Sequence, residues 1–152
     1  MNASNKICAE LVCEYNSFEP YDGKTFKGYK LVQKNNLNYY SIVTGLFRYK
    51  AKRVSENSYH ELHRRCDCHF NESLVNKVAI FQNEEDAYKA LIGYHEIDTH
   101  KYELAMLEVT IKGDLERAIH SNRDCKGAVV VVGHTIDRVK EIKLYHEKKR
   151  NY

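Results

Sequence analysis

The stretch "YHELHRRCDCHF" at residues 59–70 contains five side chains of the kinds that zinc prefers as ligands. These are His60, His63, Cys66, Cys68 and His69. Structural zinc sites usually combine two ligand pairs separated by a loop, whereas these five donors form one run, and a second pair would have to come from Cys8 and Cys13. We therefore predict no metal and no cofactor, with a zinc-stabilised interaction module as an alternative.

The same stretch has the pattern of a short amphipathic helix. Ser58 and Glu61 have the spacing of a capping box, which predicts a helix from Tyr59. Leu62 and Cys66 then share the buried stripe with Tyr59, so Cys66 is better explained as a core residue than as a ligand.

No established catalytic pattern is present. The chain lacks a glycine-rich phosphate loop, a nucleophile elbow and an HExxH sequence. A cysteine nucleophile with a histidine base is conceivable for Cys125 with His134, or for Cys68 with His69. We predict no catalytic residues. The enzyme alternative is a small nucleotide-using protein of the ADP-ribosyltransferase type, which would need a late glutamate, Glu141 or Glu147.

Basic residues are concentrated in one acid-free segment. Residues 23–55 contain no Asp or Glu and eight Lys or Arg residues. Nine basic and four acidic residues give residues 1–53 a charge of +5, whereas the remainder of the chain carries −2. Such an uneven charge distribution is suited to binding an anionic partner. The alternative is a solvated sheet face whose lysines only prevent pairing with other chains.

Alternation of residue types predicts that residues 25–54 form an antiparallel meander with one cationic face. In the first strand, Lys30 and Lys34 are expected to point away from Tyr29. The third strand should place Phe47, Tyr49 and Ala51 on the opposite face from Arg48, Lys50 and Lys52. The predicted partner-binding residues are Lys30, Lys34, Tyr40, Arg48, Lys50, Lys52 and Arg53. Lys140, Lys143 and Lys148 are expected to lie elsewhere.

The remaining elements predict an α+β fold. "KVAIFQ" at 77–82 indicates a strand, and "NEEDAYKALIGY" indicates a helix capped by Asn83. We further expect a central strand over 101–115, a helical turn over 115–119, and strands over 128–132 and "DRVKEIKLYH". Residues 1–152 should form a single globular domain with a mostly antiparallel, twisted sheet and two or three short helices.

The apolar runs bear on localisation. "AVVVVG" and "LAMLEV" are too short to cross a bilayer, and the first fifteen residues carry charges where a signal peptide needs an unbroken apolar run. We therefore expect a cytoplasmic protein without membrane contact, in which the five cysteines are reduced.

Four segments, "FKGYKLVQKNNLNYYSIVTGLFRYK", "VAIFQNEEDAYKAL", "YELAMLEVTIKGDL" and "RVKEIKLYHEK", resemble in order and pattern a loose group of small uncharacterised phage, giant-virus and bacterial proteins. The resemblance implies a viral or mobile-element setting and an α+β fold, but no activity. The sequence thus predicts a non-enzymatic binding protein whose basic sheet face engages nucleic acid or an acidic host protein surface.

Overall fold

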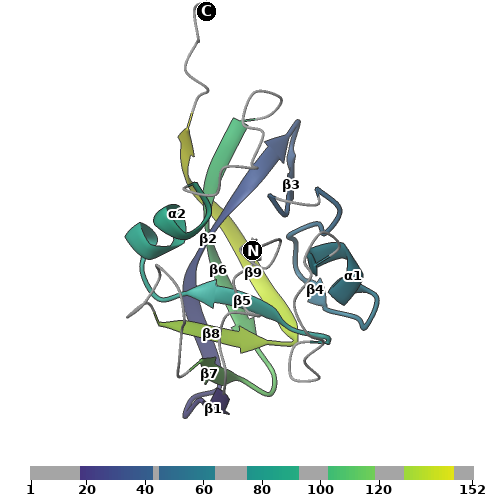
Figure 1. Ribbon diagram of the computed structural model, residues 1–152, viewed down its shortest axis with the longest axis vertical. Helices are drawn as coiled ribbons and strands as arrows, with labels where there is room; N and C mark the ends of the chain where they lie inside the picture. The colour runs from purple at the N-terminus through teal and green to yellow at the C-terminus, as the bar shows by residue number, and fades with distance from the viewer. Residues whose placement is uncertain (1–17, 43–44, 64–74, 93–102, 119–128, 146–152) are drawn as a thin grey trace, which may run out of the picture.

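The computed structural model describes residues 18–42, 45–63, 75–92, 103–118 and 129–145 (Figure 1). These ranges contain the strands β1 (Phe18–Pro20), β2 (Thr25–Asn35), β3 (Asn38–Tyr40), β4 (Lys52–Arg53), β5 (Val78–Phe81), β6 (Glu103–Lys112), β7 (Glu116–Ala118), β8 (Val130–Gly133) and β9 (Thr135–Tyr145), and the helices α1 (Ser58–His63) and α2 (Glu84–Ile92).

The strands form one open sheet in the order β1-β7-β8-β5-β2-β6-β9-β4, and β3 pairs with β2 as a hairpin. Every strand pair in the described residues is antiparallel. The described structure is therefore mostly β. The predicted mostly antiparallel sheet is confirmed. The predicted α+β class overstated the helical content, because the described residues contain only two short helices, α1 and α2.

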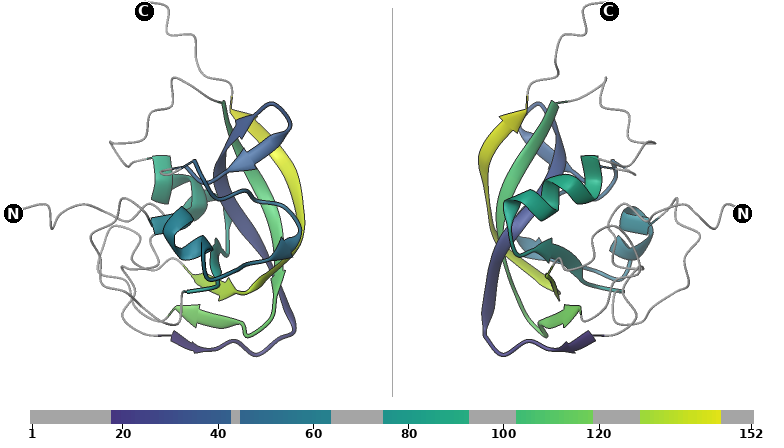
Figure 2. Two further views of the ribbon diagram at one scale, coloured as in Figure 1. Left: turned by 90° about the vertical axis from the view of Figure 1, so that its right-hand side faces the viewer. Right: turned by 60° about the vertical axis from the view of Figure 1, so that its left-hand side comes forward.

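The long strands β2, β6 and β9 form the central layer. They bow along one side of the molecule, and both helices lie on the other side (Figure 2, left). β6 lies between β2 and β9, and its first half is buried on both faces from Leu104 to Leu107. A strand buried on both faces needs a continuous apolar run, so the predicted central strand is confirmed.

β2 also connects this layer to the short strands. It pairs with β5 at one position, Tyr29 with Phe81, while it pairs with β6 along its length. A Cβ atom on Gly28 would lie 2.3 Å from the carbonyl oxygen of Phe81. Because only glycine permits this approach of the two backbones, Gly28 sets the point where β5 meets β2.

Two apolar clusters form the core on opposite faces of the sheet. The first packs Val32, Leu107 and Ile136 of the long strands with Phe47, Tyr49, Leu62 of α1 and Ile80 of β5. The second packs Leu31, Met106, Phe81, Val132 and Ala87 of α2. α2 begins as predicted, because Asn83 Oδ1 accepts a hydrogen bond of 2.9 Å from the Asp86 backbone N–H. α1 thus packs on the first cluster and α2 on the second.

Several local predictions are wrong. The segment after β3 is not the third strand of a meander: it makes a single bridge, Tyr40 with Arg48, and β4 pairs with β9 instead. Residues 116–118 form strand β7 rather than a helical turn, since they pair with β1 and β8. The helix expected from Tyr59 begins one residue earlier. Neither helix of the described ranges has the length and apolar character needed to cross a bilayer.

Candidate functional site

The predicted basic surface is not contiguous in the structure. Lys30 is fully buried, with 0% of its surface exposed. Its ammonium group donates a hydrogen bond of 3.1 Å to the Ala79 carbonyl oxygen and lies 5.7 Å from the centre of the Phe81 ring. The prediction of an exposed Lys30 is wrong, because β2 is covered on both faces at this position.

Lys34 is engaged by an acidic side chain that the sequence pattern did not place nearby. Its Nζ lies 2.8 Å from Glu141 Oε1, and the Tyr39 hydroxyl donates to the same oxygen over 2.8 Å. The hydrogen bond from Lys34 holds the pKa of Glu141 below its usual value, and the hydrogen bond to Glu141 raises the pKa of Lys34. This glutamate, considered for the enzyme alternative, is occupied by a structural contact.

The other predicted residues divide between two sides of the sheet. Arg48 donates a 2.5 Å hydrogen bond to Asn38 and bridges to Tyr40 through the backbone. Lys52 points into the sheet, where its Nζ lies 4.1 Å above the Phe47 ring and desolvation lowers its pKa. Lys50 is exposed. Arg53 lies on the opposite side, because it pairs with Thr135 in β9, and so do Tyr40 and Arg48, because Tyr40 pairs with both Gln33 of β2 and Arg48.

A different basic surface is formed by the side of β2, β6, β9 and β4 that carries Lys27. This side is exposed around Lys27 and Arg138, whereas Leu31 and Met106 at its upper end pack under α2. Residues paired directly across antiparallel strands point to the same side. The strand register therefore defines rows of residues across this side. The first row contains Thr25, Lys112, Thr135 and Arg53, and the second contains Lys27, Thr110 and Arg138. The third contains Tyr29, Glu108 and Lys140, and Lys143 lies beside Met106 at the upper end. We call this surface the outer face.

Two register shifts in β9 bring its basic residues to the outer face. Opposite β6, the shifts leave Asp137 and Ile142 as extra residues in β9. Each extra residue reverses the inward–outward alternation. Arg138 and Lys140 consequently share a side with Lys143, although three positions separate Lys140 from Lys143.

The outer face is strongly cationic. All six of its basic residues are exposed: Lys27, Arg53, Lys112, Arg138, Lys140 and Lys143. Its acidic residues are Glu108 and Asp137, and Asp137 forms an ion pair of 3.1 Å with Lys112. Four of the six lie outside the predicted acid-free segment, so counting charges along the sequence could not find them.

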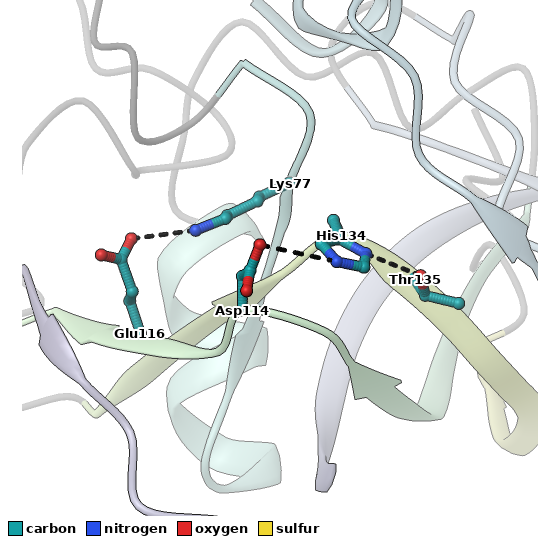
Figure 3. A network of polar contacts seen from close by, with 5 residues as sticks. All are labelled: Lys77, Asp114, Glu116, His134 and Thr135. Carbon is teal, nitrogen blue, oxygen red and sulfur yellow. Dashed lines mark hydrogen bonds and ion pairs between the residues drawn. The ribbon is translucent and has the colours of Figure 1, made fainter. Parts of the chain in front are cut away.

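Polar groups cluster beside the lower end of the outer face, where β6 turns into β7 and β8 into β9 (Figure 3). His134 Nδ1 lies 2.8 Å from Thr135 Oγ1, and its Nε2 lies 3.7 Å from Asp114 Oδ2. Lys77 and Glu116 form an ion pair of 3.0 Å. The His134 ring lies directly on Gly113, whose φ of +91° and lack of a Cβ allow this contact.

This cluster has the residue types of a nucleophile–base–acid relay but not its geometry. The distance of 3.7 Å from His134 to Asp114 exceeds a hydrogen bond, and the Asp114 side chain is 80% exposed. The contact with Thr135 is between sequence neighbours. The arrangement therefore fixes the two turns against one another. Cys125, considered as a partner of His134, lies outside the described residues, as does Glu147.

Among the residues that the structure describes, no three His, Cys, Asp or Glu side chains form a group that could hold a metal ion. Cys66, Cys68 and His69 of the opening cluster lie outside the described ranges, as do Cys8 and Cys13. The prediction about zinc therefore stays a prediction.

No protein-family model matches the chain, and neither a curated protein nor a solved structure shows significant similarity to it. The resemblance to phage, giant-virus and bacterial proteins stays a prediction as well.

Proposed function

We propose that this chain is a non-enzymatic protein that binds nucleic acid through the outer face. The observation that supports this proposal is the register of four neighbouring strands, which directs six exposed basic side chains to one side of the sheet. The viral or mobile-element setting expected from the sequence fits such a role and belongs to the same proposal.

The spacing of the basic residues suits a chain of phosphates. Alternate residues on a strand are about 7 Å apart, and neighbouring strands are about 5 Å apart. A polyanion lying across the outer face would therefore contact several cations at once, releasing one condensed counterion for each phosphate it neutralises. The hydroxyl groups of Thr25, Thr110 and Thr135 lie between these cations and supply hydrogen-bond donors for phosphate oxygens.

The test is charge reversal on the outer face, with a matched control at three basic residues that are not among its six. The triple variant Lys27→Glu, Arg138→Glu and Lys140→Glu should lower affinity for a labelled oligonucleotide at least about tenfold and reduce the salt dependence of binding by about two to three phosphate contacts. Fluorescence anisotropy between about 50 and 200 mM salt measures both quantities.

The control triple Arg48→Glu, Lys50→Glu and Arg117→Glu changes the net charge equally but leaves the outer face intact, so its affinity should stay within about threefold of the unmodified protein. Equal losses in the two triples would show that net charge alone is responsible. If the unmodified protein binds polyglutamate but no oligonucleotide, the partner is an acidic protein surface and the nucleic-acid proposal is wrong.

A further inference from the structure

A cleft of about 670 Å³ lies between α2 and the end of β9, beyond the upper end of the outer face. Its lining residues are Glu84, Glu85, Tyr88, Lys89, Lys143 and Tyr145. Neither the sequence pattern nor the proposed function assigns a role to this cleft.

Two tyrosine rings form the apolar part of the cleft. The rings of Tyr88 and Tyr145 are 5.1 Å apart between centroids and tilted by 41°. Both side chains are partly buried and pack against the apolar cluster beneath α2, which limits their rotation. At this separation the two rings pack directly against each other, so they form one preformed aromatic wall of the cleft.

The cleft already contacts one cation from within the protein. The Lys143 ammonium group lies 4.9 Å from the centre of the Tyr145 ring, which is within the range of a cation–π contact. Since Lys143 is exposed and extends from a strand, it can swing away into solvent. The position it occupies shows that the ring face is open to a positive charge.

The acidic residues make the cleft favourable for a cation once Lys143 leaves. Glu85 is neutralised by an ion pair of 3.0 Å with Lys89, and both of these side chains are largely exposed. Glu84 has no ion-pair partner among the described residues, and its charge lies close enough to Tyr145 to add to the effect of burial in raising the pKa of that hydroxyl. With Lys143 displaced, one uncompensated carboxylate faces the cleft.

We propose that this cleft binds an alkylated ammonium head group against the wall formed by Tyr88 and Tyr145, over the Tyr145 ring face that Lys143 now occupies. Glu84 is the counter-ion, and Lys143 is the internal group that the ligand displaces. An alkylated ammonium ion is favoured over a simple ammonium ion because it is weakly hydrated and loses less on entering a partly apolar site. Recognition of such ions by aromatic side chains is a general use of cation–π contacts. The proposal does not rest on nucleic-acid binding at the outer face, although Lys143 belongs to both surfaces.

Calorimetric titration of the full chain with choline tests the proposal, and 3,3-dimethylbutan-1-ol serves as the neutral probe of the same shape. We expect choline to bind and the neutral probe to bind at least tenfold more weakly. Glu84→Gln should weaken choline binding several-fold. Lys143→Gln should strengthen it several-fold, because the competing internal cation is removed. Equal binding of both probes, no choline binding, or weaker binding in Lys143→Gln would each overturn the proposal.

The same head group exists free and on trimethylated lysine side chains, and a second titration distinguishes these sources. A short peptide with one trimethyllysine should bind more tightly than choline if the natural ligand is a protein side chain, and no more tightly if it is a free small molecule. In both cases the unmethylated peptide should bind more weakly than the methylated one. Equal binding of the two peptides would overturn the preference for an alkylated cation.

Discussion

Lys30 shows how far a single residue can depart from the pattern around it. Lysine is almost never fully buried in proteins, and alternation along β2 places Lys30 on the side opposite Tyr29. That side is occupied by Val32 and the rest of an apolar cluster. The ammonium group nevertheless finds a carbonyl acceptor in Ala79 of β5, which satisfies it within the protein.

We therefore predict that Lys30 contributes to stability rather than to partner binding. Lys30→Ala should lower the free energy of unfolding by about 2–4 kcal/mol, since it leaves a cavity and removes a donor from a buried carbonyl group. Lys27→Ala, on the exposed side of the same strand, should change it by no more than about 0.5 kcal/mol. Urea denaturation measures both variants. Nearly equal, small effects would show that Lys30 lies in solvent.

Side-chain alternation predicted only part of the segment expected to be the third strand. Phe47 and Tyr49 are buried as predicted. Beyond them the pattern fails, because Ala51 is exposed and Lys52 turns inward over the Phe47 ring. Residues 47–51 are not part of a regular strand, so nothing holds successive side chains to opposite faces beyond Tyr49.

At the scale of elements, β9 shows what the sequence could not reveal. Its existence was predicted from "DRVKEIKLYH", and the structure confirms a strand over Thr135–Tyr145. The two extra residues opposite β6 were not predictable, because a bulge depends on how the partner strand pairs rather than on the local pattern. Strict alternation would place Lys143 on the side opposite Lys140 and split the outer face.

The contact of Lys34 and Tyr39 with Glu141 connects β2 and β3 to β9 and makes this connection sensitive to pH. The pKa of Glu141 is lowered in the folded protein, chiefly by the hydrogen bond from Lys34. Because the pKa of Glu141 is lower in the folded protein than the ordinary value of 4.5, the ionised carboxylate stabilises the fold. This stabilisation is fully present at pH values above 4.5 and is lost as the pH falls through the pKa of the folded protein.

Comparison of the chain with its Glu141→Gln variant checks this effect. We predict that the variant has the lower melting temperature at neutral pH and that the difference shrinks as the pH falls below 4.5, where the glutamate becomes protonated like the amide that replaces it. Glu103→Gln is the control, since Glu103 pairs with Lys34 across the strands but is not the acceptor of its 2.8 Å contact. A difference that grows on acidification would contradict the assignment.

For the whole molecule, the structure redistributes the charge that the sequence displays. The acid-free segment supplies only Lys27 and Arg53 to the outer face, and β6 and β9 supply the other basic residues. Composition along the chain predicted a basic sheet face within residues 25–54, whereas the outer face takes most of its basic residues from β6 and β9, because antiparallel pairing brings together residues far apart in sequence. Lys140 and Lys143, expected to lie elsewhere, belong to this surface.

Lys143 is shared by the outer face and the tyrosine cleft, which makes the two proposed sites interdependent. Its ammonium group lies above the Tyr145 ring when neither partner is bound. A nucleic acid on the outer face would attract Lys143 to a phosphate and thereby vacate the ring face. Because energetic coupling between two binding sites is reciprocal, each ligand should then increase the affinity for the other by the same factor.

We predict that a saturating oligonucleotide increases the affinity of the chain for choline several-fold at constant ionic strength, measured by calorimetric titration. The negative charge of the oligonucleotide could attract any cation, so Lys143→Gln is the decisive control. In that variant the cleft is already vacant, and the oligonucleotide should add little to choline affinity. If the enhancement persists undiminished in Lys143→Gln, long-range attraction explains it. If the oligonucleotide weakens choline binding in the unmodified chain, Lys143 does not move between the two sites.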